Sequence, residues 1–185
     1  MAVYLTEITT GTDERSLVAA LVEQLDPAAI TAGGRVVEVQ VSQDLARIFF
    51  VAEGVEPARL TEAIAGIGAS QSKPAAVRLV GATLDEVRAR AGGQASHLVE
   101  WDFPADLDME TYLARKKEKA PLYDQIPEVS FLRTYVREDM GKCLCLYDAP
   151  DDAAVVRARA AVSTPIDRLH RLAPPSDATV ASPQP

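Results

Sequence analysis

The fold of this chain can be predicted outward from one stretch, Lys142-Cys143-Leu144-Cys145-Leu146-Tyr147-Asp148-Ala149-Pro150-Asp151-Asp152. A polar turn, Glu138-Asp139-Met140-Gly141, precedes this stretch, and a run of Ala, Val and Arg with helical spacing follows it. Turn residues before an alternating segment are typical of a hairpin, and the run after it has the spacing of a helix. The stretch is therefore predicted to be a strand that leaves a hairpin and leads into a helix.

The alternation of this strand predicts which side chains share a face. Successive side chains of a strand point to opposite faces of the sheet. Leu144 and Leu146 therefore point one way, and Cys143, Cys145 and Tyr147 point the other way. We expect the two leucines to pack under helices, and we expect the face with the sulfur and hydroxyl groups to carry the function.

Composition bounds the class of protein. The chain has 185 residues, of which 48% are hydrophobic and 25% are charged, as in a soluble globular protein with a substantial core. Its net charge of −8 argues against a general binder of nucleic acid or anionic membranes, because neutralising phosphates needs concentrated Lys and Arg. No apolar run approaches the roughly 20 residues of a membrane span, and the N-terminus lacks the pattern of a secretion signal. We expect a cytoplasmic protein with no nucleic-acid partner and no membrane partner.

Two local features qualify this composition. The one basic run, Arg115-Lys116-Lys117-Glu118-Lys119, is expected to be a solvated helix face. Cys143 and Cys145 are predicted to be reduced thiols, because side chains two apart on a strand start about 6–7 Å from each other at the backbone. The chain has two histidines, His97 and His170, and their spacing does not match a structural zinc site. His97, Cys143 and Cys145 are the candidate metal ligands.

The first part of the chain predicts the element order β-α-β-β-α-β, which is the ferredoxin-like split βαβ unit. Strands are expected over 2–9, 35–41, 45–51 and 75–80. Helices are expected from Thr12 or Asp13 to about Asp26-Pro27, and from Pro57 through Ile67.

The second part of the chain predicts the same order again. Strands are expected over 97–103, 129–136, 142–148 and 166–172, and helices after Asp106 or Asp108 and over 151–162. We therefore predict an α+β protein of two tandem ferredoxin-like repeats, 1–82 and 96–172. A short helix and linker at 83–95, including Gly92-Gly93-Gln94-Ala95, joins them, and a flexible tail at 173–185 follows.

The two predicted repeats also match residue by residue. Residues 34–67 align with 129–162 without a gap, which places Phe50 beside Cys145. Tyr4-Leu5-Thr6-Glu7 likewise resembles His97-Leu98-Val99-Glu100. A fixed period of this kind is typical of a tandem duplication.

Three stretches of the second repeat resemble a known family: His97-Leu98-Val99-Glu100, Cys145-Leu146-Tyr147-Asp148-Ala149-Pro150-Asp151 and Thr164-Pro165-Ile166-Asp167-Arg168. They resemble a family of small bacterial domains of unknown function that is typified by a nickel-binding protein. The resemblance covers about residues 97–172 and implies a ferredoxin-like fold, dimerisation and nickel binding. Members often carry a histidine on the second helix where this chain has Ala158, so we predict weak nickel binding at most.

The sheet of the second repeat is predicted to have one apolar and one polar face. The residues expected against the helices are Val99, Trp101, Leu132, Leu144, Leu146 and Leu169. The residues expected on the opposite face are Glu100, Arg133, Tyr135, Cys145, Tyr147, Arg168 and His170. The corresponding face of the first repeat, with Ile48, Phe50 and Ala52, is apolar and should not be left in water.

We expect these two sheet faces to approach each other as a pseudo-dimeric α+β barrel and to enclose a ligand space with one apolar and one polar wall. Glu100 and Cys145 should both face that space. A structural interpretation also exists for each residue. Glu100 can form an ion pair with Arg133 or Arg168, Cys145 can fill the core, and the tyrosines and histidines can be bystanders.

Three functions are compatible with this pattern, and the sequence identifies no cofactor. The first is a cytoplasmic binding protein for a small organic molecule or, by the family resemblance, a transition metal such as nickel. The second is a cofactor-independent isomerase, cyclase or hydrolase with Glu100 as general acid/base and Cys145 as nucleophile. The third is a homodimeric assembly or interaction protein. The sequence contains no phosphate-binding Gly-rich loop, serine elbow or zinc signature.

Overall fold

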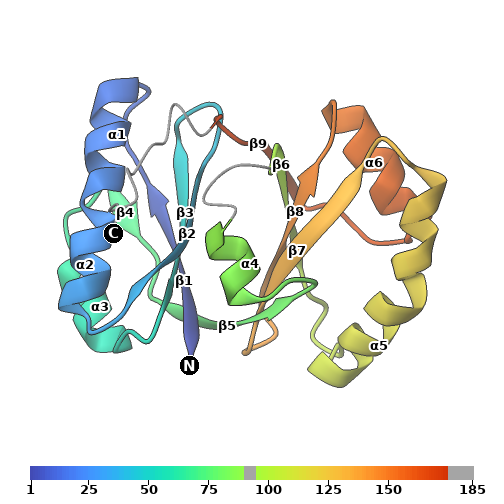
Figure 1. Ribbon diagram of the computed structural model, residues 1–185, viewed down its shortest axis with the longest axis horizontal. Helices are drawn as coiled ribbons and strands as arrows, with labels where there is room; N and C mark the ends of the chain where they lie inside the picture. The colour runs from blue at the N-terminus through green and yellow to red at the C-terminus, as the bar shows by residue number, and fades with distance from the viewer. Residues whose placement is uncertain (90–94, 175–185) are drawn as a thin grey trace. The chain divides into compact units, whose positions relative to one another are not determined.

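The structure is a computed structural model that describes residues 1–89 and 95–174. The chain divides into two compact units, and each is described by itself (Figure 1). Of the described residues, unit 1 contains 1–77, 84–89 and 172–174, and unit 2 contains 78–83 and 95–171. Residues 90–94 of the predicted linker and residues 175–185 of the predicted tail lie outside the described residues. We expected the flexible tail to begin at Ala173, but Ala173 is buried and its N–H donates to the Val41 carbonyl at 2.8 Å, so that starting point is wrong. The predicted repeat boundaries stay a prediction.

Unit 1 has the strand order β2-β3-β1-β5, with antiparallel neighbours and a short β4 that also pairs with β1. The last residues of β5, from Arg78, are counted in unit 2. The elements are β1 (Val3–Thr9), α1 (Arg15–Glu23), α2 (Leu25–Thr31), β2 (Arg35–Val41), β3 (Arg47–Glu53), α3 (Pro57–Ala63), β4 (Ser70–Gln71), β5 (Ala75–Val80) and α4 (Leu84–Ala89).

The first predicted helix is two helices. We expected one helix to end near Asp26-Pro27, but α1 ends at Glu23 and α2 begins at Leu25. Pro27 lies in the first turn of α2, where its missing N–H has no intrahelical partner to lose. Glu14, rather than Thr12 or Asp13, occupies the N-cap position of α1.

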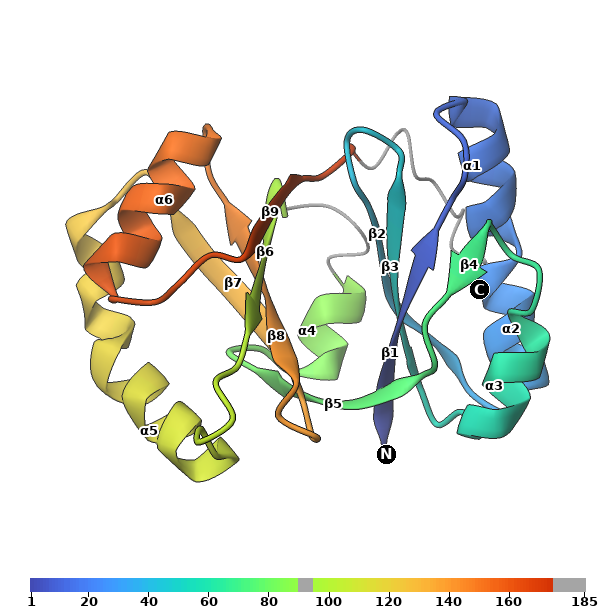
Figure 2. The same ribbon diagram turned by 180° about the vertical axis from the view of Figure 1, so that it is seen from behind.

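The helices α1, α2 and α3 cover one face of the unit 1 sheet, as Figures 1 and 2 show. Phe50 is fully buried in the core on this helix side, together with Ile8 and Val22. The expectation that Phe50 lies on an open apolar face is therefore wrong. The segment Ile48-Phe49-Phe50-Val51-Ala52 is apolar at every position, so its sequence contains no alternation that distinguishes the two faces.

Unit 2 has the strand order β7-β8-β6-β9, again with antiparallel neighbours. This order, with helices on one face, is the predicted ferredoxin-like α+β arrangement. Its elements are β6 (His97–Asp102), α5 (Met109–Lys119), the 3₁₀ helix η1 (Ala120–Gln125), β7 (Ser130–Arg137), β8 (Lys142–Asp148), α6 (Asp152–Ala161) and β9 (Arg168–Arg171).

Polar side chains fix the ends of these elements. The Asp108 carboxylate accepts a hydrogen bond from the Thr111 N–H at 2.7 Å, and Asp151 accepts one from the Ala154 N–H at 2.8 Å, so each caps its helix. Asp139 accepts a hydrogen bond from the Gly141 N–H at 2.9 Å in the turn between β7 and β8. The predicted hairpin and the predicted helix starts at Asp108 and Asp151 are confirmed.

The register of unit 2 reverses part of the predicted face assignment. Val99 pairs with Cys145 and Glu100 pairs with Leu144, and directly paired residues of antiparallel strands share a face. The helices α5 and α6 lie on one face of the unit 2 sheet (Figure 2). Cys145 therefore lies on that face, and Leu144 lies on the other face with Glu100. The expectation that Leu144 and Leu146 pack under the helices is wrong, because both lie on the face of Glu100.

Candidate functional site

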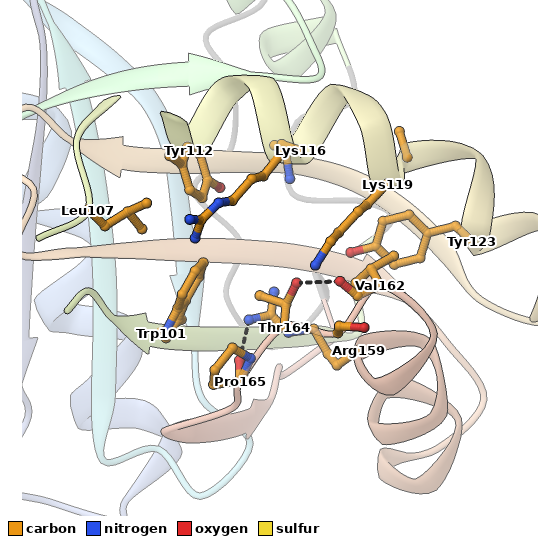
Figure 3. Close-up of a pocket in the computed structure, with 13 residues that line it drawn as sticks. Trp101, Leu107, Tyr112, Lys116, Lys119, Tyr123, Arg159, Val162, Thr164 and Pro165 are labelled. Carbon is orange, nitrogen blue, oxygen red and sulfur yellow. Dashed lines mark hydrogen bonds between the residues drawn. The ribbon is translucent and has the colours of Figure 1, made fainter. Parts of the chain in front are cut away.

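A cavity of about 130 Å³ lies on the helix-covered side of the unit 2 sheet. We call it the unit 2 cavity. Figure 3 shows Lys119 from α5, Tyr123 from η1 and Arg159 from α6 around it, with Thr164 and Pro165 from the loop before β9. Trp101 of β6, together with Tyr112 and Tyr123, gives it aromatic walls. An apolar cavity of about 150 Å³ can hold benzene, so this volume suits a molecule of roughly that size.

The polar part of the lining has one sign of charge. Arg115, Lys116 and Lys119 from α5 and Arg159 from α6 line the unit 2 cavity, and no Asp or Glu of residues 1–89 and 95–174 does. Low-dielectric walls with charges of one sign concentrate the opposite charge. The charges that line the unit 2 cavity therefore favour an anion over a cation.

The basic run of α5 is thus not only a solvated face, as the sequence suggested. Positions 115, 116 and 119 recur at the spacing that places side chains on one side of a helix. These three side chains line the unit 2 cavity, whereas Lys117 is exposed and does not line it. Lys116 is half-buried, and its Nζ lies 3.9 Å from the centre of the Phe131 ring. Burial lowers the pKa of Lys116 below its ordinary value.

Arg159 is a buried cation whose hydrogen bonds are incomplete. Its residue is 2% exposed. Its Nη1 donates to the Tyr147 hydroxyl at 3.3 Å and to the Cys145 sulfur at 3.5 Å, and its Nη2 donates to the Pro165 carbonyl. The buried Nε has no hydrogen-bond partner among the described residues. In that part of the chain, no carboxylate forms an ion pair with Arg159.

The two cysteines are free, buried and in contact. Their sulfurs lie 3.7 Å apart, and the Thr134 hydroxyl lies 3.2 Å from the Cys145 sulfur. The hydrogen bond from Cys143 lowers the pKa of the Cys145 thiol well below its usual value; burial opposes this effect, and the charges of Lys116 and Arg159 reinforce it. The pKa of Cys143 is raised because its thiol is the donor in that pair and because it is buried. Of the two thiols, Cys145 is therefore the one that loses its proton more readily.

Tyr147 joins this cluster from β8. Its hydroxyl lies 2.9 Å from the hydroxyl of Tyr123, which stacks on Phe131 with ring centres 5.5 Å apart. Burial raises the pKa of Tyr147, so this hydroxyl stays protonated at neutral pH and acts as a neutral hydrogen-bond partner.

The opposite face of the sheet holds a paired charge cluster around Glu100. The Glu100 side chain is fully buried, and it accepts hydrogen bonds from Lys142, from His170 at 2.8 Å and from Arg168 at 3.1 Å. Burial raises the pKa of Glu100, but the hydrogen bonds from His170, Arg168 and Lys142 outweigh burial and lower it strongly. An ionised carboxylate held by three partners is a weak base and has no proton to donate at neutral pH.

Five of the predicted site residues share that face, and three do not. Glu100, Arg133, Tyr135, Arg168 and His170 lie on it by strand register. Cys145 and Tyr147 lie on the helix-covered face instead, and Phe50 lies in the core of unit 1. The expectation that Glu100 and Cys145 face one space is wrong, because paired residues set them on opposite sides of the sheet.

The candidate metal ligands do not gather either. His97 Nδ1 lies 2.8 Å from the Ser96 hydroxyl, and His97 Nε2 lies 3.2 Å from an oxygen of Asp152. Cys143 and Cys145 contact each other on the neighbouring strand. Among residues 1–89 and 95–174, no three His, Cys, Asp or Glu side chains are grouped so that they could hold a metal ion.

Sequence reasoning did not single out the cations of the unit 2 cavity. A signal for Arg159 was present, because Val155, Arg159 and Val162 follow the four- and three-residue spacing of a buried helix stripe. Arg159 therefore stands where a core residue is expected. Lys116 and Lys119 are three residues apart and so lie on one side of the helix. That spacing could have indicated a shared site, whereas the number of charges in the run could not.

Comparisons with known proteins bear on the fold and on unit 2. A crystal structure of a "Putative Chlorite dismutase" matches with a TM-score of 0.58 and 16% identity, over 96% of this chain and 98% of that chain. A "putative monooxygenase" from Lactobacillus acidophilus matches with a TM-score of 0.51 and 11% identity, over 93% and 92%. At these identities the matches show a shared α+β fold alone. No curated protein sequence matches the chain. Residues 97–172, nearly all of unit 2, match the family of SCO4226-like nickel-responsive proteins.

Proposed function

We propose that this chain is a small-ligand-binding protein and that its ligand occupies the unit 2 cavity. One observation carries the proposal: a space of about 130 Å³ with aromatic walls and a few convergent polar groups. Small-molecule sites have this makeup, since apolar walls supply affinity and a few polar groups fix orientation. Trp101, Tyr112 and Tyr123 are the walls, and Arg159 and Thr164 are among the polar groups.

The face with Glu100 supports a ligand site less well. Its carboxylate already has three cationic or imidazole partners, and both hydrogen-bonding oxygens are used. A group that is satisfied within the protein gains little from a ligand. The two-residue mechanism with Glu100 as acid/base and Cys145 as nucleophile also loses its geometric basis, because these side chains lie on opposite faces.

Nickel does not fit the described residues. The family that residues 97–172 match is named as nickel-responsive. In this chain, however, no three candidate ligands are grouped in the described part. The thiols of Cys143 and Cys145 lie beside the Arg159 guanidinium, which repels a divalent cation. Ala158, where the family often has histidine, is buried and offers no ligand. We therefore propose no function that depends on bound nickel.

The expectations about duplication, assembly, location and partners are part of the proposal. The tandem duplication is supported by the β-α-β-β-α-β order that each unit has by itself. The pseudo-dimeric barrel, the homodimer, the cytoplasmic location and the lack of a nucleic-acid partner stay predictions. Within the two described segments, no helix combines the length and the apolar character that crossing a membrane requires.

A blocking substitution tests the proposed site. Ala120 is exposed at the start of η1 and lines the unit 2 cavity, so Ala120→Phe should fill the space without disturbing the core. Ala114→Phe, on the exposed part of α5 and outside the lining, is the matched control. A ligand that binds the native state raises the melting temperature. We expect benzoate, benzyl alcohol or inorganic phosphate to raise it in wild type and Ala114→Phe, but not in Ala120→Phe.

Two outcomes would contradict the proposal. One is a set of wild-type melting curves that none of the three probes moves at millimolar concentration. The other is an Ala120→Phe variant that responds to a probe as strongly as wild type, since binding would then occur elsewhere.

A further inference from the structure

The structure assigns a chemical class to the ligand: we propose that the unit 2 cavity binds a small anion, a carboxylate or oxyanion no larger than benzoate, through Arg159, Lys116 and Lys119. This inference rests on the proposed function and adds the charge of the ligand to it.

Among residues 1–89 and 95–174, the positive charges that line the unit 2 cavity have no matching negative charges there. Within the described residues, four cationic side chains and no carboxylate line the unit 2 cavity. In the described part of the chain, none of the ion pairs involves Lys116, Lys119 or Arg159. Elsewhere in unit 2, buried or half-buried cations are paired: Lys142 and Arg168, for example, both contact Glu100. Buried charges in proteins are usually paired. The unpaired cations of the cavity therefore indicate that a negatively charged ligand is their partner.

Arg159 has one N–H donor that makes no hydrogen bond to the described residues. Its Nε is buried and has no partner among the described residues, although its two other nitrogens are bonded. A buried N–H without an acceptor is rare and unfavourable. Because Nε is buried, a carboxylate or phosphate oxygen in the unit 2 cavity accepts its hydrogen bond once the Arg159 side chain turns toward the ligand. Guanidinium groups bind such oxygens with good geometry.

A Cys145 thiolate can offset only part of the positive charge around the unit 2 cavity. Its sulfur is 3.5 Å from Arg159 Nη1, and the charge of Lys116 also acts on it, so one thiolate is shared between two positive charges. Lys119 remains without a negative partner among the described residues of the lining. The thiolate is also held by Thr134 at 3.2 Å on the sheet side of the cluster. It therefore leaves the cavity side of Arg159 without a negative partner.

The size and the walls narrow the class. A volume of about 130 Å³ is too small to enclose a nucleotide or a large coenzyme, but it admits an aromatic or short-chain carboxylate, or inorganic phosphate. The rings of Trp101, Tyr112 and Tyr123 favour a flat apolar body next to the charged group. Carboxylate and phosphate share the recognised chemistry, an oxygen with negative charge, and the experiment distinguishes the two sources.

Trp101 provides the readout, because it is the chain's single tryptophan and it lines the unit 2 cavity. Titrations at constant ionic strength would compare benzoate with benzyl alcohol, which has a similar size but no charge, and with inorganic phosphate. We expect benzoate to bind at least about tenfold more tightly than benzyl alcohol, as a charge-assisted hydrogen bond predicts.

Variants of α5 locate the charge that matters. Lys119→Met should weaken benzoate binding by about three- to tenfold and leave benzyl alcohol unchanged. Lys117→Met removes the same charge from an exposed position outside the lining and should change neither affinity by more than about twofold. Arg159→Met should weaken benzoate binding by about tenfold or more. If this buried variant does not fold, Lys119→Met alone carries the comparison.

The outcomes separate the two proposals. Equal affinity for benzoate and benzyl alcohol overturns the anion inference and leaves the ligand cavity standing. No fluorescence response to any of the three probes overturns both. Binding of phosphate with no binding of benzoate supports an anion site and assigns it to inorganic oxyanions. Equal losses in Lys117→Met and Lys119→Met would overturn the inference, because they would reflect the long-range field alone.

Discussion

The Nη1 atom of Arg159 lies 3.5 Å from the sulfur of Cys145, within a cluster where both residues are at most 2% exposed. The contact joins β8, the strand within the stretch 142–152, to α6, the helix that follows it. A cation this deeply buried favours a negative charge on its neighbour. The ionisation of Cys145 depends on this cluster, and the charge cluster around Glu100 lies on the other face of the same sheet.

We predict that Cys145 is a thiolate at neutral pH. Its pKa is lowered by the hydrogen bond from Cys143 and by the charges of Lys116 and Arg159, so ionisation should begin well below the ordinary thiol value of about 8.5. The ultraviolet absorbance of a thiolate should therefore be present in the native protein at pH 7. It should disappear in Cys145→Ser and persist in Cys143→Ser, whose hydroxyl can still donate. A native spectrum without that absorbance would contradict this assignment.

We predict that Glu100 is a structural residue. Glu100→Gln removes the negative partner of Lys142, Arg168 and His170 and should lower the free energy of unfolding by about 2–4 kcal/mol. Asp102→Asn, which removes a half-exposed partner of Arg168, should cost less than about 1 kcal/mol and is the control. Urea unfolding measures both. Because Glu100 faces away from the unit 2 cavity, benzoate affinity should stay within about twofold, and a large loss would show that this face binds ligand.

We predict that burial of His97 makes stability depend on pH. Burial lowers the pKa of His97 below its ordinary value of about 6.5, although Asp152 opposes the shift. Between these two pKa values the unfolded chain holds a proton that the folded chain lacks. The free energy of unfolding therefore falls as pH drops below about 6.5 and is flat with respect to this group above it. Urea unfolding at pH 7.5 and 5.5 should show a decrease that His97→Gln reduces; an undiminished decrease in the variant would assign it to other groups.

We predict nickel binding that is weak at most. The described residues offer no group of three ligands, and the cysteine pair lies beside Arg159. Calorimetric titration should give no stoichiometric binding at micromolar protein. A tight, one-to-one isotherm that is lost in the Cys143→Ser, Cys145→Ser double variant would restore the thiols as metal ligands.

The element order was predictable because hydrophobic spacing and cap residues act locally. Asp108 and Asp151 could be recognised as caps, and the turn before Gly141 as a hairpin, from neighbouring residues alone. The faces were not predictable in the same way. β3 and β8 are buried on both sides, so the residues before and after Phe50 and Cys145 in the sequence do not alternate between apolar and polar and do not indicate which side chains face the helices.

A second difficulty is a register shift in β7. The pairing of β7 with β8 shifts between Phe131 and Arg133, so alternation counted through this strand changes face at that point. The cations of the unit 2 cavity were missed for another reason. Lys116 and Arg159 are long side chains whose burial depends on packing between α5 and α6, and a linear charge pattern does not contain that information.

The most direct test of the ligand site is the nuclear magnetic resonance signal of the Arg159 Nε–H group during a benzoate titration. The group can be assigned by its absence from Arg159→Lys, and it has no partner among the described residues of the free protein. We predict a saturable shift of this resonance with the same dissociation constant that Trp101 fluorescence reports, because the carboxylate accepts its hydrogen bond. An Arg159 resonance that stays unmoved while benzoate saturates the protein would contradict the account.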